Sequence, residues 1–149
     1  MPHFGLMDAD ALGPERAALM RAKLHIRAGR RRLRQGKVSY AFITLYDALV
    51  HAMEWHLLKP ELRARLDIRE GEDLGDERTV YGILVRSGVL DGRLDYQEVT
   101  DMVDGALAFR LEEGFDREGM LGKLEDVFTQ LGVLPFDEEE LPPEDPSTY

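Results

Sequence analysis

The longest apolar stretch of the chain, from Val38 to Leu58, constrains the fold most. Its apolar residues recur at three- and four-residue steps on two neighbouring stripes, a pattern typical of an α-helix buried around most of its circumference. One stripe contains Val38, Ala41, Phe42, Leu45, Leu49, Ala52 and Met53, and the other contains Ile43, Tyr46, Val50 and Leu57. Such a helix belongs in the middle of a bundle, and Lys59-Pro60 ends it.

Ionisable side chains at Asp47, His51, Glu54 and His56 argue against a membrane span in this stretch. The first residues have neither a basic start nor an uninterrupted apolar run, so no signal peptide is predicted. The chain has no cysteine, which excludes disulfides and thiolate metal sites, and its formal net charge of −10 opposes non-specific attachment to anionic surfaces. We expect a cytoplasmic protein without membrane contact.

A second long helix precedes the apolar one. Gly13-Pro14 favours a helix start, and one apolar stripe follows at Leu19, Ala22, Ile26, Gly29 and Leu33. Gly36 suits the left-handed residue that follows a helix end. The two helices therefore form a long antiparallel hairpin over about residues 14–58.

The rest of the chain favours further helices. A short turn at 61–66 and a loop at 67–75 lead to a short helix that ends at Ser87, capped by Asp76 or Asp73. Further helices follow at about 96–113 and 117–131, with Asp95 and Asp116 as caps. Residues 135–149 contain six acidic residues and four prolines, which predicts a mobile tail. We expect an all-α, single-domain bundle of about five helices over 14–134, after a flexible segment at 1–13.

Small residues in the hairpin suggest a resemblance to known helical repeats. Gly29, Gly36, Ala41 and Ala48 fall at the small-residue spacings of a single tetratricopeptide-like hairpin, with Leu45 at its large apolar position. Three positions depart from that family: Arg32 replaces its tyrosine, His25 its tryptophan and Met53 its proline. No second copy follows, so the resemblance implies close helix packing and not an array.

Residues 15–60 are also similar to the second half of HEPN-type helical bundles, in which a glycine-containing turn leads into a helix that reads like the stretch from Ser39. Ribonuclease members of that group have an arginine followed by histidine after four to six residues. Arg21 and His25 have only three residues between them. The resemblance therefore implies a bundle fold without the nuclease chemistry.

Asp47, His51 and Glu54 lie at positions i, i+4 and i+7 and therefore share one side of the second helix. Imidazole and carboxylate groups are ligands for zinc, iron or manganese. His25 on the first helix is the imidazole that could complete a divalent-metal site. The alternative is an ordinary i, i+4 pair of Asp47 and His51 on the helix surface or at a subunit contact.

Positive charge is concentrated towards the end of the first helix. We call Arg27, Arg30, Arg31, Arg32, Arg34 and Lys37 the basic band. Such a band could neutralise phosphates of a nucleic acid, although no aromatic residues for stacking bases are interleaved within it. The competing hypothesis is that acidic stretches at 67–77, 91–104 and 137–145 pair with it, within the chain or across a dimer.

No catalytic motif is recognised. The sequence has no glycine-rich phosphate loop, no His-Glu-x-x-His and no Gly-x-Ser-x-Gly, so we predict neither catalytic residues nor a cofactor. The leading hypothesis is a non-enzymatic interaction or accessory module that binds itself as a dimer or binds another protein. The alternatives are a nucleic-acid-binding protein that uses the basic band, and a metal-binding bundle that uses Asp47 and His51.

Overall fold

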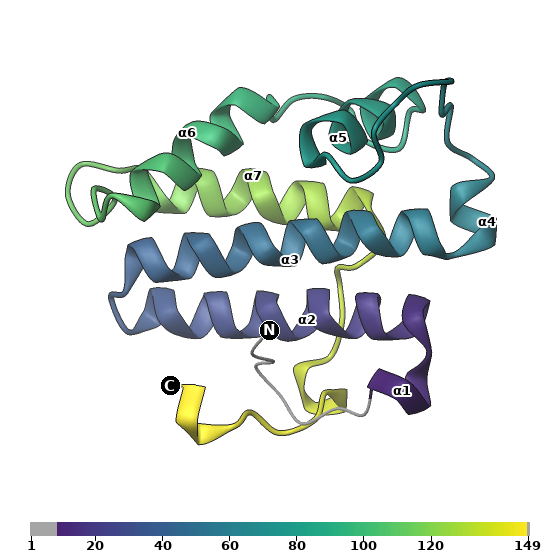
Figure 1. Cartoon of the computed structure of the whole chain (residues 1–149). Coiled ribbons are helices and arrows are strands. Elements are labelled where there is room, and N and C mark those ends of the chain that lie inside the picture. Colours follow the sequence, from purple (N-terminus) through teal and green to yellow (C-terminus); the bar gives the residue numbers. More distant parts are fainter. Residues whose placement is uncertain (1–8, 149) are drawn as a thin grey trace.

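Two antiparallel helices, α2 (Pro14–Arg34) and α3 (Val38–Leu58), lie at the centre of the molecule (Figure 1). At the turn, Gly36 has φ +76°, and the N–H of Lys37 donates to the carbonyl of Arg32 at 2.9 Å. Midway along the hairpin, a Cβ atom on Gly29 would lie 2.7 Å from Cδ2 of Leu45. Glycine therefore lets the two helices approach more closely than any larger residue would allow, as the small-residue spacing predicts.

The computed structural model describes residues 9–148, and every regular element in this range is helical. The other elements are α1 (Ala9–Leu12), α4 (Pro60–Arg63), α5 (Glu77–Arg86), α6 (Tyr96–Leu107), α7 (Arg117–Gln130) and the 3-10 helices η1 (Glu138–Glu140) and η2 (Pro146–Thr148). The prediction of an all-α fold is therefore confirmed for this range. No helix within it has the length and apolarity that crossing a membrane requires.

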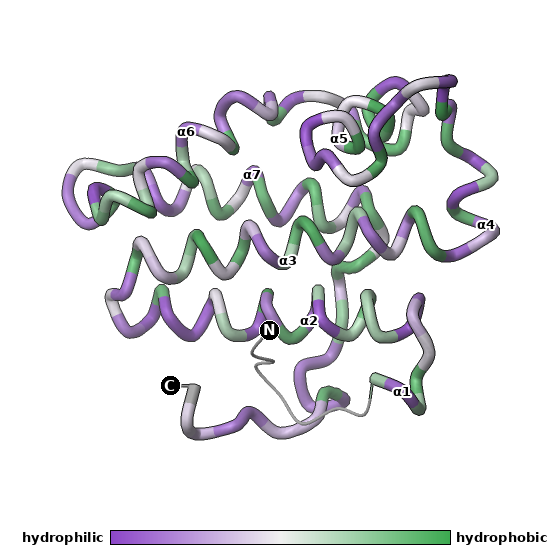
Figure 2. Tube along the Cα trace, viewed as in Figure 1, coloured by the Kyte–Doolittle hydropathy of each residue, from purple (hydrophilic) through white to green (hydrophobic). Residues whose placement is uncertain are grey.

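Helix α3 contacts α2, α4, α5, α6 and α7. Figure 2 shows hydrophobic residues recurring along its whole length, in keeping with a central helix. Phe42, Leu45 and Leu49 of α3 are completely buried, as are Leu84 of α5 and Phe128 of α7. Leu45 of the first stripe lies against Gly29 of α2. Phe42 of the same stripe meets Phe115, and Tyr46 of the second stripe meets Tyr96, so α3 packs against neighbours on more than one side.

Aspartates begin the three later helices, as predicted. Asp76 accepts from the N–H of Thr79, Asp116 accepts from the N–H of Gly119, and Asp95 forms a capping box with Glu98. The predicted end of α6 is wrong, because the helix stops at Leu107 and not near residue 113. Leu107, the last residue of α6, is 62% exposed although it continues the apolar spacing of Val99, Val103 and Ala106.

The mobility predicted for residues 135–149 is not confirmed. Within the described range, the segment from 135 onward descends from the end of α7 and runs along the side of α2 that faces away from α3 (Figure 1). Leu24 and Ala28 of α2 are fully buried although they lie off the stripe that faces α3. In the predicted N-terminal segment, α1 occupies Ala9–Leu12, and residues 1–8 lie outside the described range.

Candidate functional site

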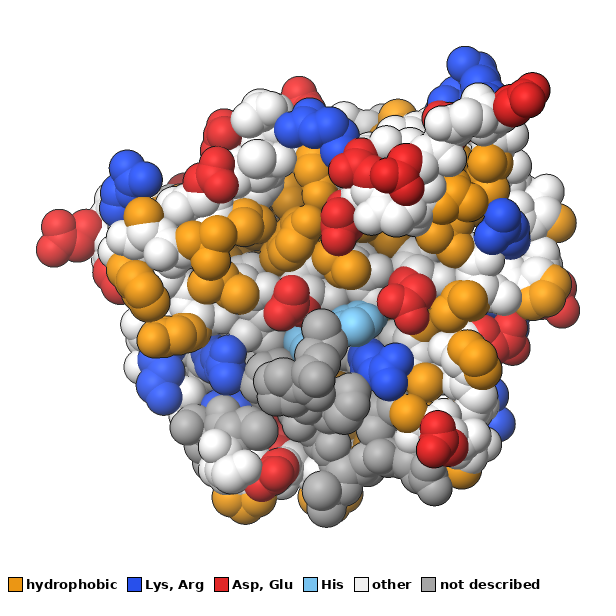
Figure 3. Space-filling view, in the orientation of Figure 1, with side chains coloured by type: hydrophobic (Ala, Val, Ile, Leu, Met, Phe, Trp, Pro, Cys, Tyr) orange, Lys and Arg blue, Asp and Glu red, His pale blue; other side chains and the backbone are white. Residues whose placement is uncertain are grey.

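Two histidines from the two helices of the hairpin meet in its interior. The ring centroids of His25 on α2 and His51 on α3 are 5.0 Å apart, and the side chains are 1% and 5% exposed. Nδ1 of His25 lies 2.7 Å from the carbonyl oxygen of Arg21. Because a carbonyl only accepts, Nδ1 carries the proton and donates. Figure 3 shows histidine atoms at the surface between acidic side chains.

Two linked hydrogen bonds lie closer to the start of α3. Nη1 of Arg32 donates to Oγ1 of Thr44 at 2.7 Å, and that hydroxyl donates to the carbonyl of Tyr40 at 2.8 Å. Burial raises the pKa of Asp47, an effect that the charge of Arg32 opposes. Burial also lowers the pKa of Arg32, with repulsion from Arg31 acting in the same direction. Burial in the hairpin therefore disfavours the charged forms of Asp47 and Arg32.

The predicted metal ligands are only partly brought together. His25 and His51 are neighbours, but among residues 9–148 no three histidine, aspartate or glutamate side chains form a group that could hold a metal ion. Glu54 instead lines a pocket between α3 and α5 with Val50 and Leu57. The metal-binding hypothesis stays a prediction.

Acidic residues of the same chain meet the basic band. Nε of Arg31 donates to Oε2 of Glu144 at 3.1 Å, and Nε of Arg27 lies 3.6 Å from Oε1 of the same carboxylate. These side chains are only 10–12% exposed. Arg30 forms an ion pair with Glu125 of α7. Intramolecular pairing thus occupies three of the six residues that the nucleic-acid hypothesis requires.

The other members of the basic band do not form one surface. Arg32 is turned towards Thr44 in the hairpin, whereas Arg34 and Lys37 are exposed at the α2–α3 turn. Part of the pairing could be predicted, because the acidic stretch at 137–145 contains Glu144. Glu125 lies outside every stretch named from the sequence, and only the packing of α7 near α2 brings it to Arg30.

An exposed apolar surface lies where α3 begins and α6 ends (Figure 3). We call it the aromatic corner, formed by Tyr40, Leu107 and Phe109, which are 51%, 62% and 56% exposed. The rings of Tyr40 and Phe109 meet edge to face with centroids 5.3 Å apart. Within the described residues, Leu58 is the only other large apolar side chain classed as exposed. Most of the exposed large apolar side chains therefore gather at one corner.

Phe109 also has an unusual backbone conformation. Its φ is +52°, and it is the one non-glycine residue with positive φ in the described range. The N–H of Arg110 donates to the carbonyl of Gly105 at 2.8 Å, and the N–H of Phe109 donates to that of Ala106 at 3.0 Å. This pair of bonds is the Schellman motif, in which glycine normally occupies the position of Phe109. The sequence does not indicate a Schellman motif here, because no glycine marks this helix end.

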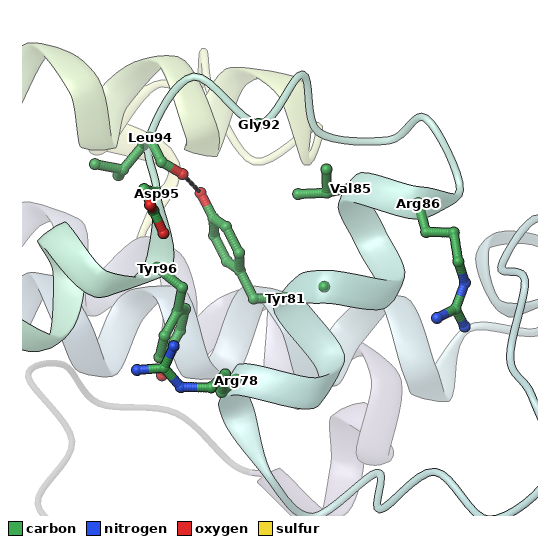
Figure 4. A pocket seen from close by; sticks show the side chains of 9 residues that line it. Arg78, Tyr81, Val85, Arg86, Gly92, Leu94, Asp95 and Tyr96 are labelled. Carbon is green, nitrogen blue, oxygen red and sulfur yellow. Dashed lines mark hydrogen bonds between the residues drawn. The ribbon is translucent and has the colours of Figure 1, made fainter.

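A surface pocket of about 430 Å³ lies between α5 and the loop that precedes α6 (Figure 4). The guanidinium of Arg78 stacks over the ring of Tyr96, with its Cζ atom 5.2 Å from the centroid. The hydroxyl of Tyr81 donates to the carbonyl of Leu94 at 2.6 Å. Burial and nearby carboxylates, Asp91 first among them, raise the pKa of Tyr81 to about 12, so this hydroxyl stays protonated at neutral pH.

The charged groups of that pocket are already engaged. Arg86, which points away from Tyr81 and Tyr96 in Figure 4, binds both oxygens of Glu72 at 2.6 and 3.1 Å. Asp95 caps α6 by accepting from the N–H of Gln97 at 3.0 Å. These contacts stabilise the loops around α5.

Comparison of the chain with family models, with curated proteins and with solved structures found no match.

Proposed function

We propose that the protein is a non-enzymatic cytoplasmic interaction module that self-associates through the aromatic corner. The observation that carries this proposal is the conformation of Phe109. Its aromatic side chain is 56% exposed, and its backbone has a left-handed conformation that is unfavourable for a residue with a Cβ atom. A left-handed residue with a side chain costs on the order of 1 kcal/mol. A residue that is unfavourable for the free chain is expected where an intermolecular contact repays the cost.

Charge around the aromatic corner favours a second copy of this chain as the partner. Lys37 precedes Tyr40 by one helical turn, and Arg110 follows Phe109 directly. Glu112 binds the hydroxyl of Ser39 at 2.7 Å, which places a carboxylate beside the same corner. Both signs of charge therefore border the apolar centre, and a two-fold axis through it would bring the cations of one copy to the carboxylate of the other.

Sedimentation equilibrium over a wide concentration range tests the proposal. We expect the parent protein to dimerise, and Phe109→Gly or Leu107→Ser to raise the dissociation constant by about tenfold or more, because each removes apolar area from the centre of the contact. Leu58→Ser is the matched control, since Leu58 is 41% exposed at the opposite end of α3. A parent protein that stays monomeric at millimolar concentration, or a dimer that tolerates both corner variants, would refute self-association through this surface.

A further inference from the structure

A second surface pocket, of about 220 Å³, lies between α3 and α5. Its walls are largely apolar: Val50, Met53 and Leu57 come from α3, Leu74 from the preceding loop and Val80 from α5. The charged residues in its lining are Glu54 of α3 and Glu77 at the start of α5, and no lysine or arginine joins them. An apolar pocket with one sign of charge at its edge is selective for ligands of the opposite sign.

The two carboxylates of this pocket have no cationic partner in the described part of the chain. Both side chains are partly buried, and neither forms a hydrogen bond or an ion pair with any other side chain among residues 9–148. By contrast, Glu72, Glu98, Glu125 and Glu144 all bind lysine or arginine side chains. A partly buried carboxylate without such a partner loses hydration, which a cation bound in the same pocket would offset. Figure 3 shows acidic side chains bordering apolar surface in this part of the molecule.

We propose that this pocket binds a primary ammonium group on a four- or five-carbon apolar stem, as a lysine side chain or a free alkyl diamine presents it. The stem would lie against Val50, Leu57 and Val80, and the ammonium group would reach Glu54 and Glu77. Lysine buries its methylene groups against apolar surface in this way while its charged end keeps polar partners. A volume of about 220 Å³ suits one long side chain and is small for a nucleotide or a larger cofactor.

This inference is independent of self-association, because the pocket and the aromatic corner share no residue. The corner variants Phe109→Gly and Leu107→Ser should therefore leave ammonium binding unchanged. Loss of dimerisation with retained binding, and the reverse, are both measurable.

Amide chemical-shift titration of the full chain tests the pocket. The probes are lysine capped at both ends, norleucine capped in the same way, and 1,5-diaminopentane. We expect saturable shifts at Gly75 and Glu77 with capped lysine, and at least tenfold weaker binding of capped norleucine, which has the same stem without the charge. Equal binding of the two would show that the pocket is only an apolar crevice and would overturn the proposal.

A second experiment removes the negative charge of the pocket. The double variant Glu54→Gln, Glu77→Gln keeps the shape of the pocket and should weaken the binding of capped lysine at least tenfold. The control variant Glu61→Gln, on exposed α4, should leave this binding unchanged. Lysine binding that survives the double change would also overturn the proposal. If both cations bind, a higher affinity for capped lysine assigns the site to a lysine side chain of a protein partner. A higher affinity for 1,5-diaminopentane assigns it to free amines.

Discussion

Four helices of this protein end in the same backbone motif, yet one of them differs in the residue that makes the turn. Helices α2, α5 and α7 use Gly36, Gly88 and Gly132, with φ between +76° and +80°. Helix α6 uses Phe109 at +52°. The closing hydrogen bond is equivalent in all four, at 2.9, 3.0 and 2.9 Å for the glycine ends and 2.8 Å for α6. The motif can therefore form without glycine, but the residue then carries a conformational cost.

Lack of space does not explain why three of these ends use glycine. Gly88 closes α5 with no atom within 4 Å of where a Cβ would lie, and Gly132 is likewise only loosely contacted, by Trp55 at 3.9 Å. Phe109 instead presents its ring to Tyr40 and to solvent. Three of the ends thus follow the lowest-energy choice for the backbone, and the fourth gives up backbone stability for an exposed aromatic side chain.

The end of α7 has an additional partner, and removing it should have the largest effect. Nε2 of His56 lies 2.7 Å from the carbonyl of Leu131, just beyond α7, and both groups are buried. We expect His56→Ala to lower the free energy of unfolding by about 2–4 kcal/mol, because it leaves a cavity and a buried carbonyl without its donor. Urea denaturation monitored by circular dichroism measures this loss. A loss below about 1 kcal/mol would contradict the assigned role.

The same contact gives a pH dependence of known sign. Burial lowers the pKa of His56, an effect that its hydrogen bond to Leu131 opposes. The unfolded chain, with a histidine pKa near 6.5, then binds more protons than the folded chain, so this contribution to stability is complete above about pH 6.5 and is lost as the pH falls. His56→Gln keeps an N–H donor without titrating. Its stability should therefore fall less than that of the parent between pH 7 and about pH 5.

Glycine at the end of α5 provides the intermediate effect. Gly88→Ala should lower the free energy of unfolding by about 1 kcal/mol, because the left-handed conformation disfavours a Cβ although space is available. Gly82 lies within the same helix, without positive φ and with open space beside it, so Gly82→Ala should raise stability by about 0.5–1 kcal/mol. Thermal unfolding of the two variants side by side checks the opposite signs. Equal signs would show that backbone conformation does not distinguish the two sites.

Phe109→Gly should have the smallest effect on the stability of the monomer. The substitution relieves the left-handed conformation, worth on the order of 1 kcal/mol. It also removes the edge-to-face contact with Tyr40, worth about 0.5–1.5 kcal/mol. We therefore expect the free energy of unfolding to change by less than about 1 kcal/mol in urea titrations at low protein concentration. The variant should also lose the self-association proposed above. A destabilisation above 2 kcal/mol would mean that the ring is mainly a structural contact.

The hairpin could be predicted from the sequence because its signals are local. Pro14, Gly36 and Pro60 mark ends that agree with the structure, and the apolar stripes of α3 specify a buried helix. His25 could also be named as a possible partner of His51, because it is the histidine of the first helix, and the structure brings the two rings within 5.0 Å of each other.

The features that could not be predicted from the sequence depend on which helices pack together. Periodicity shows that a helix has a buried face but does not identify the neighbour that covers it. His56, for example, binds the carbonyl of Leu131 beyond the end of α7, 75 residues further on, and the local pattern of α3 does not indicate that partner. The early end of α6 was not predicted, because phenylalanine occupies the position at which glycine usually marks the end of a helix. Glu54 and Glu77 lie far apart in sequence and share a pocket only after α5 packs on α3.

The contact between α2 and the C-terminal segment has a consequence for the order of folding. Gly29 and Leu45, which set the closest approach in the hairpin, are near neighbours in sequence, whereas the bond from Arg31 to Glu144 spans 113 residues. Short loops close at a lower entropic cost than long ones, so the hairpin should form early and the C-terminal segment should dock late. On the ribosome, the hairpin can pack before Glu144 has been synthesised. Arg27 and Arg31 would then spend part of the lifetime of every nascent chain facing solvent and the polyanionic ribosome surface.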